Sequence, residues 1–210
     1  MNQYCVYLLS KNDAAAKREM KSRVLSGFQA CPIFEIAYFL KKMWKTNWAN
    51  LKRKLRKIRT DEDPILRKKS KVVSNYNDRL KVLVEDMYET MDVAYGVGLA
   101  APQVGILKRV IVIDNRDEEN GKRFYMINPD IIEREGEEIS MEGCLSVPGK
   151  QGTVERAKDI KVRYNDLSGE EKIMYAEDFL ARIIQHEIDH LDGILYTDKA
   201  IEMYEAESEE

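Results

Sequence analysis

The sequence has few cysteines and histidines and no long apolar run, and each shortage excludes a class of protein. Three widely spaced cysteines, Cys5, Cys31 and Cys144, are too few for a disulfide scaffold, which favours a reducing compartment. The most apolar stretch, residues 33–40, contains Glu35 and is far shorter than the roughly 18–20 residues of a membrane-spanning helix. No small-residue cleavage pattern follows an apolar block near the start of the sequence, so a secretory signal is not expected. The sequence therefore predicts a cytoplasmic protein without a membrane partner.

Charge is unevenly distributed along the 210 residues. The formal net charge is −3, yet residues 1–60 hold fourteen Lys and Arg against three acidic residues, a net charge of +11, so the other residues carry −14. A hydrophobic share of 44% can fill a core and argues against wholesale disorder. The pattern predicts a basic extension over residues 1–53, a main domain over residues 54–200 and a frayed acidic tail over residues 201–210.

Apolar periodicity predicts two helices in the main domain. Apolar residues recur at spacings of three and four over residues 80–94, which is typical of an amphipathic helix that ends near Gly96. A second helix is expected from Glu177 or Asp178 to a stop at Gly193. Short strands are expected at residues 109–114, 124–127, 154–156, 159–164 and 172–175, with a hairpin turn at 166–169. Short, mostly antiparallel strands around a central helix would make an α+β fold.

The second helix carries the strongest chemical signal, His-Glu-Ile-Asp-His at residues 186–190. Residues four apart on a helix lie one above the other, so both imidazoles face the same point and can bind one metal ion. Glu187 lies about 100° round the helix from His186, so it can flank a metal without binding it, as a general base does. His186 and His190 are the only histidines of the chain, which favours a metal site over two unrelated helix histidines.

A tetrahedral catalytic metal takes three protein ligands and keeps an open position, so a third ligand is needed. Cys144 is the only cysteine in the acidic part of the chain, and Gly143 beside it allows close approach of the backbone. A lone cysteine is often an inert buried residue. Glu202 or Glu205 is the competing third ligand, as in many zinc peptidases, but both lie in the predicted frayed tail. Cys144 is therefore preferred.

Residues 96–105 form a third unusual segment, Gly-Val-Gly-Leu-Ala-Ala-Pro-Gln-Val-Gly. Its glycines leave the backbone accessible to a ligand. It is not a phosphate-binding loop, because no Lys-Ser or Lys-Thr pair follows. Composition alone fits a plain helix-to-strand connection equally well. Gln103 is notable, because a side-chain amide can donate a hydrogen bond to a developing oxyanion.

Residues 96–105, 142–146 and 185–193 together resemble the three signature motifs of the peptide deformylases, in the right order and separation. Residues 63–67 also resemble that family's N-terminal stretch, and the similarity covers roughly two-thirds of the chain. The resemblance implies a metal-dependent hydrolase of the cytoplasm. Its reaction would remove the formyl group from the N-terminal formylmethionine of newly made polypeptides and release formate.

The resemblance also implies a metal and its neighbours. Cys144, His186 and His190 would hold one divalent ion, and Glu187 would move a proton from the attacking water to the leaving amine. A thiolate with two imidazoles suits zinc by ligand type. The family implies Fe²⁺ instead, with Zn²⁺, Ni²⁺ or Co²⁺ able to substitute.

The remaining roles concern the oxyanion and the substrate. By the same resemblance, the side-chain amide of Gln103 and the backbone N–H of Leu145 would stabilise the oxyanion. The substrate-binding residues would be Gly98, through its backbone, and three residues that border the methionine pocket, Val97, Glu142 and Arg156.

Both ends of the chain depart from the family pattern. Relatives usually begin near the position of Arg56, so residues 1–53 are either a genuine extension or sequence upstream of the true start. Some relatives dock on the ribosome through a longer, basic C-terminal helix, whereas this tail is short and acidic and ribosomal RNA would repel it. A monomer that meets nascent peptides near the ribosomal exit tunnel is expected.

Two other functions compete with this interpretation. A zinc endopeptidase could use the same helix motif, but the chain offers no convincing downstream ligand. A non-catalytic, ribosome-associated protein with a structural metal would need neither Glu187 nor Gln103. Both residues are present, which favours the hydrolase.

Overall fold

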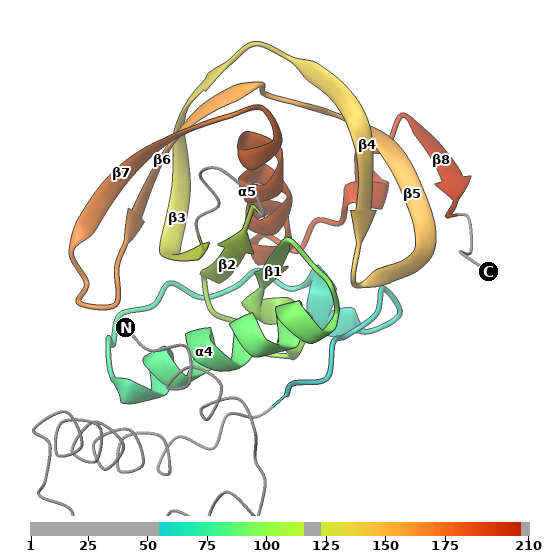
Figure 1. Cartoon of the computed structure of the whole chain (residues 1–210). Helices are drawn as coiled ribbons and strands as arrows, with labels where there is room; N and C mark the ends of the chain where they lie inside the picture. Colours follow the sequence, from blue (N-terminus) through green and yellow to red (C-terminus); the bar gives the residue numbers. More distant parts are fainter. Residues whose placement is uncertain (1–54, 116–122, 207–210) are drawn as a thin grey trace, which may run out of the picture. The chain divides into compact units, whose positions relative to one another are not determined.

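The computed structural model describes residues 55–115 and 123–206. The predicted basic extension, residues 1–53, and the last part of the acidic tail, residues 207–210, lie outside the described residues. Within the described ranges, no helix is both long enough and apolar enough to cross a membrane. The predicted α+β class is confirmed, since helices α4 (Asp78–Val93) and α5 (Asp178–Leu191) pack with two antiparallel sheets (Figure 1).

The strands form a larger and a smaller sheet. The larger sheet has the order β1-β2-β3-β6-β7, and the smaller one has the order β4-β5-β8. The larger sheet contains β1 (Gly98–Ala100), β2 (Val110–Asp114), β3 (Arg123–Glu135), β6 (Asp159–Asn165) and β7 (Glu171–Glu177). The smaller sheet contains β4 (Glu138–Cys144), β5 (Val147–Arg156) and β8 (Glu202–Glu205). Figure 1 shows α5 between the two sheets, so side chains of this helix can meet strands of both.

The alternation of side chains along β2 divides the core between the two helices. Val110 and Val112 pack in a cluster with the apolar face of α4, whereas Ile111 and Ile113 pack with the apolar face of α5. Successive strand residues point to opposite faces, so one buried strand can serve both clusters. Helix α5 is thereby held against the sheet along its apolar stripe.

Helix α5 begins and ends where the sequence predicts. Glu177 is its N-cap and Asp192 its C-cap. Gly193 follows with φ +78°, a left-handed conformation that favours glycine. A Cβ at Gly193 would also lie 2.7 Å from the carbonyl oxygen of Arg67. The chain must therefore turn away after the second histidine, and only glycine fits at the turn.

Besides the short buried strand β1, polar strands were the ones that periodicity did not reveal. β3 is 13 residues long and continues well beyond the predicted residues 124–127, and β4 was not predicted. The added part of β3 pairs with β6 through register shifts, and its residues 133–135 are exposed. In β4 the exposed and less exposed residues alternate, but several of the inward ones are polar. Backbone pairing, rather than apolar burial, defines these strands.

The prediction of a frayed tail is wrong for residues 202–205, which form the edge strand β8. β8 pairs with β5 in antiparallel register, with Gly152 opposite Met203. A Cβ at Gly152 would lie 2.8 Å from Met203 Sδ, so this glycine lets the edge strand approach closely. All four side chains of β8 are exposed, so its two glutamates stay in water while the backbone pairs.

Candidate metal centre and catalytic cavity

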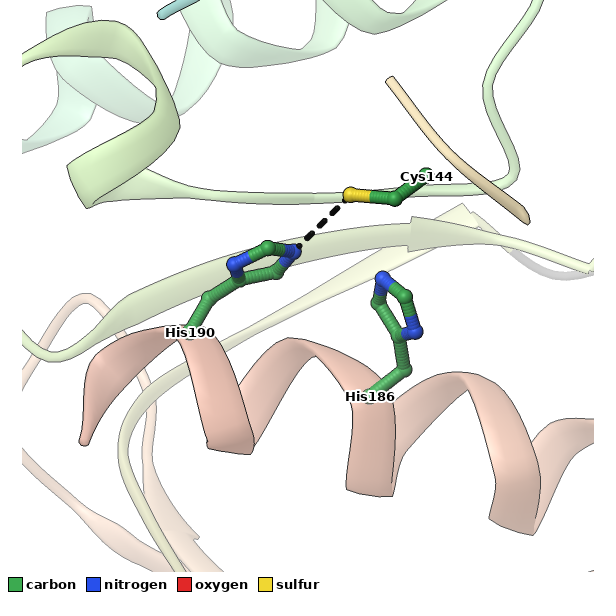
Figure 2. Close-up of side chains that lie close together, drawn as sticks. All are labelled: Cys144, His186 and His190. Carbon is green, nitrogen blue, oxygen red and sulfur yellow. Dashed lines mark hydrogen bonds between the residues drawn. The ribbon is translucent and has the colours of Figure 1, made fainter. Parts of the chain in front are cut away.

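Three side chains from two elements converge at one point (Figure 2). His186 and His190 project from one face of α5, with their ring centroids 5.0 Å apart. Cys144 is the last residue of β4, and its Sγ lies 3.2 Å from His190 Nε2. One possible ligand atom from each residue lies within 4.8 Å of the other two. The structure thus brings the histidine pair and the preferred third ligand together.

The competing third ligands lie elsewhere. Glu202 and Glu205 are exposed on β8, and β5 separates β8 from the strand that carries Cys144. Neighbouring strands are about 4.8 Å apart, so a position two strands away is roughly 10 Å distant. Neither glutamate is therefore grouped with the two histidines.

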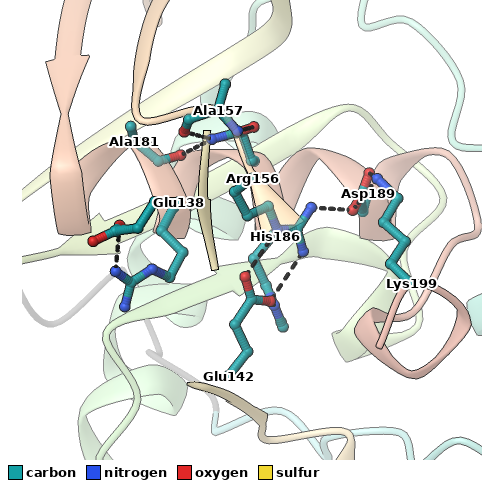
Figure 3. Close-up of polar contacts among 10 residues, drawn as sticks. Glu138, Glu142, Arg156, Ala157, Ala181, His186, Asp189 and Lys199 are labelled. Atoms are coloured by element: carbon teal, nitrogen blue, oxygen red, sulfur yellow. Dashed lines mark hydrogen bonds and ion pairs between the residues drawn. The ribbon is translucent and has the colours of Figure 1, made fainter. Parts of the chain in front are cut away.

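Buried charged residues contact the His186 ring and fix its orientation (Figure 3). Its Nδ1 lies 2.8 Å from Glu142 Oε2. Arg156 donates to the same carboxylate, from Nε to Oε1 at 2.8 Å and from Nη2 to Oε2 at 3.0 Å. The third arm of the guanidinium, Nη1, pairs with Asp189, which also accepts from Lys199 Nζ. Because Nδ1 is engaged by Glu142, Nε2 is the His186 nitrogen left for a metal.

The charge states of this group follow from its contacts. Burial alone would raise the pKa of Glu142, but hydrogen bonds with Arg156 and His186 lower it to about 2. Burial alone would lower the pKa of His186, but contacts with Cys144 and Glu142 raise it well above its ordinary value. Burial lowers the pKa of His190 well below its ordinary value. A ligand nitrogen must be unprotonated, so metal binding and protonation of these nitrogens exclude each other.

The three donors fit a divalent transition metal. One thiolate and two imidazoles are ligands that both zinc and ferrous iron accept. Typical metal–sulfur and metal–nitrogen bonds in tetrahedral geometry put sulfur and nitrogen about 3.5 Å apart. The 3.2 Å between Cys144 Sγ and His190 Nε2 is close to that separation. The carboxylate behind His186 is a common outer partner of a metal-bound histidine.

Glu187 lies beside the three donors without belonging to their network. Its side chain is buried, and its Oε2 has no hydrogen-bond partner among the described residues. Burial raises its pKa to about 7. The carboxylate lies against Gly98 in β1, where a Cβ would be only 2.4 Å from Oε1. The glycine therefore makes room for a carboxyl group that can accept and release a proton near neutral pH.

Gln103 places an amide nitrogen next to the sulfur ligand. It lies in the 3₁₀ helix η2 (Ala101–Val104), and its Oε1 accepts a hydrogen bond from the Ala100 N–H at 2.7 Å. This bond orients Nε2, which donates to Ser146 Oγ at 3.1 Å and lies 3.6 Å from Cys144 Sγ. The backbone N–H of Ser146 donates to the same sulfur at 3.4 Å. N–H donors thus surround the sulfur side of the site.

These groups surround one cavity of 390 Å³. Most of the residues selected from the sequence line it: Val97, Gly98, Gln103, Glu142, Cys144, Leu145, His186 and Glu187. Arg156 does not line this cavity but lies behind Glu142, and His190 is buried beside Cys144. Segments 96–105, 142–146 and 185–193, far apart in the sequence, therefore share one site.

Comparison with known proteins now decides the family. Residues 55–206 match the family model described as polypeptide deformylase. The chain belongs to this family. It is 53% identical over 156 residues to the peptide deformylase of Finegoldia magna, covering 74% of this chain and 95% of the relative. It is 54% identical over 144 residues to peptide deformylase 1 of Clostridium perfringens, covering 69% of this chain and 97% of the relative.

Solved peptide deformylases share the fold. The crystal structure from Thermotoga maritima has a TM-score of 0.68 and 42% identity, and the match covers 71% of this chain and 99% of that one. The structure from Synechococcus elongatus in complex with actinonin has a TM-score of 0.66 and 41% identity, covering 70% of this chain and 79% of that one. The predicted class of activity is confirmed: the family consists of metal-dependent hydrolases that remove N-formyl groups from nascent polypeptides. The endopeptidase and structural-metal alternatives are not favoured.

The sequence analysis missed the residues that orient His186. Asp189 and Lys199 extend the ion pairs behind Arg156, and the Tyr196 ring stacks on the His186 ring with centroids 6.1 Å apart. Glu142 was considered only as part of the substrate pocket. Its spacing of two residues from Cys144 would have signalled this second role only with β4 predicted, because alternate residues of a strand share a face. Asp189 and Lys199 carried none, since their partners are set by tertiary contacts.

Proposed function

We propose that this chain deformylates N-formylmethionyl peptides with the residues of the cavity described above. The observation that carries the proposal is the convergence of Cys144, His186 and His190 beside the buried carboxylate of Glu187, one oxygen of which has no partner among residues 55–115 and 123–206. Metal ligands next to an unpaired buried base are the arrangement that hydrolysis of an amide requires.

Cys144 Sγ, His190 and His186 Nε2 would hold the metal in this proposal. A divalent ion bound there supplies a Lewis acid and lowers the pKa of water. We propose Fe²⁺ as the native ion, with Zn²⁺, Ni²⁺ or Co²⁺ as substitutes, since a thiolate and two imidazoles accept all of them. Glu142, anchored by Arg156, keeps the His186 ring in the orientation that presents Nε2.

Glu187 is the proton carrier. Its carboxylate takes a proton from water and delivers it to the amine nitrogen that leaves when the formyl C–N bond breaks. A pKa of about 7 suits both halves of this task, because the group gains and loses a proton with little driving force. Gly98 has no Cβ, which leaves room for the carboxylate to lie against β1.

Two N–H groups stabilise the negative charge on the formyl oxygen. Gln103 Nε2 is oriented by the Ala100 N–H and lies beside the sulfur of Cys144. The backbone N–H of Leu145 belongs to the residue that follows Cys144 and also lines the cavity. Donors fixed in place before the reaction need no reorganisation as charge develops.

The peptide is held by an open sheet edge. β1 is an edge strand of the larger sheet, and β4 is an edge strand of the smaller one. Residues of both line the cavity, so an extended peptide between them can pair with the backbone of Gly98. Val97 and Glu142 border the first side chain of the substrate. Arg156 contributes from behind, by fixing Glu142.

The proposal is tested by formate release from formyl-Met-Ala-Ser. The full chain is loaded with Fe²⁺ under anaerobic conditions, and casein cleavage is measured alongside. Rapid formate release without casein cleavage is expected, and Glu187→Gln is the matched control because it retains size and the proposed ligands. Casein cleavage without formate release would support the endopeptidase. A metal-loaded chain with neither activity would refute the proposed function.

The proposal extends to the cellular setting. We infer a cytoplasmic monomer that works near the ribosomal exit tunnel, with residues 1–53 as a basic extension outside the catalytic domain and residues 201–210 as an acidic end segment. The family match begins only at residue 55, and residues 1–53 hold ten Lys and Arg against three acidic residues, a net charge of +7 that favours contact with ribosomal RNA.

Deletion of residues 1–53 tests this extension. Catalysis on formyl-Met-Ala-Ser should stay within about twofold of the full chain, since a terminal segment outside the catalytic domain is dispensable for a short substrate. Co-sedimentation with ribosomes should weaken steeply from low to physiological salt and be lost on deletion. Equal pelleting of both proteins at low salt would contradict the docking role.

A further inference from the structure

Ser146 carries a buried hydroxyl group close to the cavity, and the mechanism described above does not use it. The residue follows Leu145 directly, and it is fully buried. Gln103, Cys144 and Leu145 are among the residues that line the cavity, whereas Ser146 is not. A substrate in the cavity therefore does not touch this hydroxyl group, and any effect on the reaction must pass through a neighbouring residue.

That neighbour is Gln103, whose side-chain amide is held at both of its ends. The Oε1 atom accepts a hydrogen bond from the Ala100 N–H at 2.7 Å. A backbone N–H can only donate, so the amide oxygen must face Ala100 and the amide nitrogen must face the other side. There the Nε2 atom donates to Ser146 Oγ at 3.1 Å. The two bonds together fix the plane of the amide.

The amide nitrogen has one more N–H group than Ser146 can accept. The two N–H groups lie in the plane of the amide and point in different directions. One of them is directed at Ser146 Oγ, and Cys144 Sγ lies 3.6 Å from the same nitrogen. This contact with sulfur is long for a hydrogen bond. The second N–H therefore remains available to an oxygen atom in the cavity.

The backbones of Gln103 and Ser146 are fixed by bonds in which the Ser146 side chain takes no part. The Arg59 N–H donates to the Gln103 carbonyl oxygen at 2.7 Å. Two residues later, the Asp61 N–H donates to the Ser146 carbonyl oxygen at 2.8 Å. The Ser146 N–H donates to Cys144 Sγ at 3.4 Å. Loss of the Ser146 hydroxyl group alone should therefore leave both backbones in place and release only the Gln103 amide.

On the basis of the function proposed above, we propose that Ser146 is a positioning residue for the oxyanion site. Its hydroxyl group accepts one N–H of Gln103 and thereby aims the other N–H at the developing negative charge. Without the hydroxyl group, the amide can rotate about its last side-chain bond and donate to the Cys144 sulfur instead. A donor that must reorganise during the reaction stabilises the transition state less. The loss should fall on kcat rather than KM, because the charge develops only in the transition state.

The first experiment observes the Gln103 amide by NMR in the isotope-labelled, zinc-loaded full chain. The two amide protons are identified by their absence from the spectrum of Gln103→Ala. In Ser146→Ala they should exchange with solvent about fivefold faster, because one hydrogen bond is lost. Unchanged exchange would overturn the proposal. If Ser146→Ala does not fold, the wild-type spectrum decides: exchange as fast as that of the exposed Gln151 amide would overturn the proposal.

The second experiment measures kcat and KM on formyl-Met-Ala-Ser. Ser146→Ala should lower kcat by about tenfold, less than the roughly 10²–10³-fold typical of a lost oxyanion donor, with KM within about twofold and metal content unchanged. Ser70→Ala is the matched control, because Ser70 is also buried but its Oγ has no hydrogen-bond partner among the described residues. Its kcat should stay within about twofold of wild type. In a Gln103→Ala background, Ser146→Ala should change kcat by less than about twofold.

The outcomes separate this proposal from the function on which it rests. If the losses in the double variant are additive, Ser146 does not act through Gln103, and the proposal is overturned. A loss that falls on KM, or an equal loss in Ser70→Ala, overturns it as well. A metal-loaded wild-type chain that releases no formate would instead refute the deformylase function, whatever the amide spectrum shows.

Discussion

Helices α4 and α5 pack on opposite faces of the same sheet, yet they bury polar side chains with different consequences. The buried polar residues of α4 are Asp86 and Thr90. Asp86 Oδ2 accepts from Arg56 Nε at 3.1 Å and from Nη2 at 2.8 Å. Thr90 Oγ1 accepts from the Arg56 backbone N–H and donates to the Asp86 carbonyl oxygen. These bonds tie the chain before the helix onto it, so the buried polarity of α4 is structural.

Helix α5 buries four polar residues in its second half, Gln185, His186, Glu187 and His190. Gln185 resembles the α4 residues, because its amide is fully used by the backbone of Ala157 and Ala181. Glu187 Oε2 and His190 Nδ1, in contrast, have no partner among the described residues. Unpaired buried polar atoms lower stability, and Glu89 Oε2 on α4 is another such atom. The comparison teaches that a missing partner points to catalysis only in combination with position, since Glu187 and His190 lie at the three possible metal ligands and Glu89 does not.

Removal of the strand ligand should break the α5 site most completely. Cys144→Ala deletes the thiolate, so metal and activity should be lost together. The loss of metal affinity should exceed the roughly 10- to 100-fold typical of an outer-shell residue. Metal per chain, measured by elemental analysis after gel filtration, checks this. Stoichiometric metal in the variant would show that Cys144 is not a ligand.

Loss of the Glu187 carboxylate should lower turnover without lowering the metal content. Glu187→Gln is expected to keep metal, because Glu187 lies outside the group of three donors. Its turnover should fall by about 10²–10⁴-fold, as for other lost general acid–base groups. Parallel measurement of metal content and formate release distinguishes the two roles. Near-normal rates at full metal occupancy would refute the proposed proton transfer.

The close contact between Gly98 in β1 and Glu187 in α5 provides a third test. In Gly98→Ala the added Cβ would lie 2.4 Å from Glu187 Oε1, so the carboxylate must move. A displaced catalytic group should lower kcat/KM by about 10- to 100-fold with metal retained. Gly143→Ala is the matched control from the same cavity, since the nearest neighbour of its Cβ in the described part of the chain would be Gln151 Cγ at 3.8 Å. Equal losses in the two variants would contradict a specific clash with Glu187.

Removal of a buried carboxylate charge on α4 should lower stability and leave catalysis unchanged. Asp86→Asn removes the charge that accepts two hydrogen bonds from Arg56 while keeping the side-chain size. The free energy of unfolding should fall by about 1–3 kcal/mol, as urea denaturation would report. Its kcat/KM should stay within about twofold of wild type. A large catalytic defect in the folded variant would contradict a purely structural role for Asp86.

Local patterns made part of this site predictable. The spacing of His186 and His190 places both rings on one helix face wherever the helix lies, and Gly193 marks its end through local backbone geometry. The strands β4 and β8 were harder, because Glu138 and Glu142 are inward-facing but charged, and β8 is exposed throughout. Their order comes from backbone pairing with β5, which no side-chain period reports.

The sequence by itself therefore determined the α+β class, the two amphipathic helices and the paired histidines, since each depends on residues a few positions apart. Tertiary structure decided which distant residue joins them. It placed β5 between β4 and β8, which sets Cys144 beside the histidines and leaves Glu202 and Glu205 apart. It also linked Arg156, Glu142 and His186 through buried charge, although they come from three different elements. Such contacts depend on long-range packing in which each partner is stable only because the others are present, and local sequence carries no record of it.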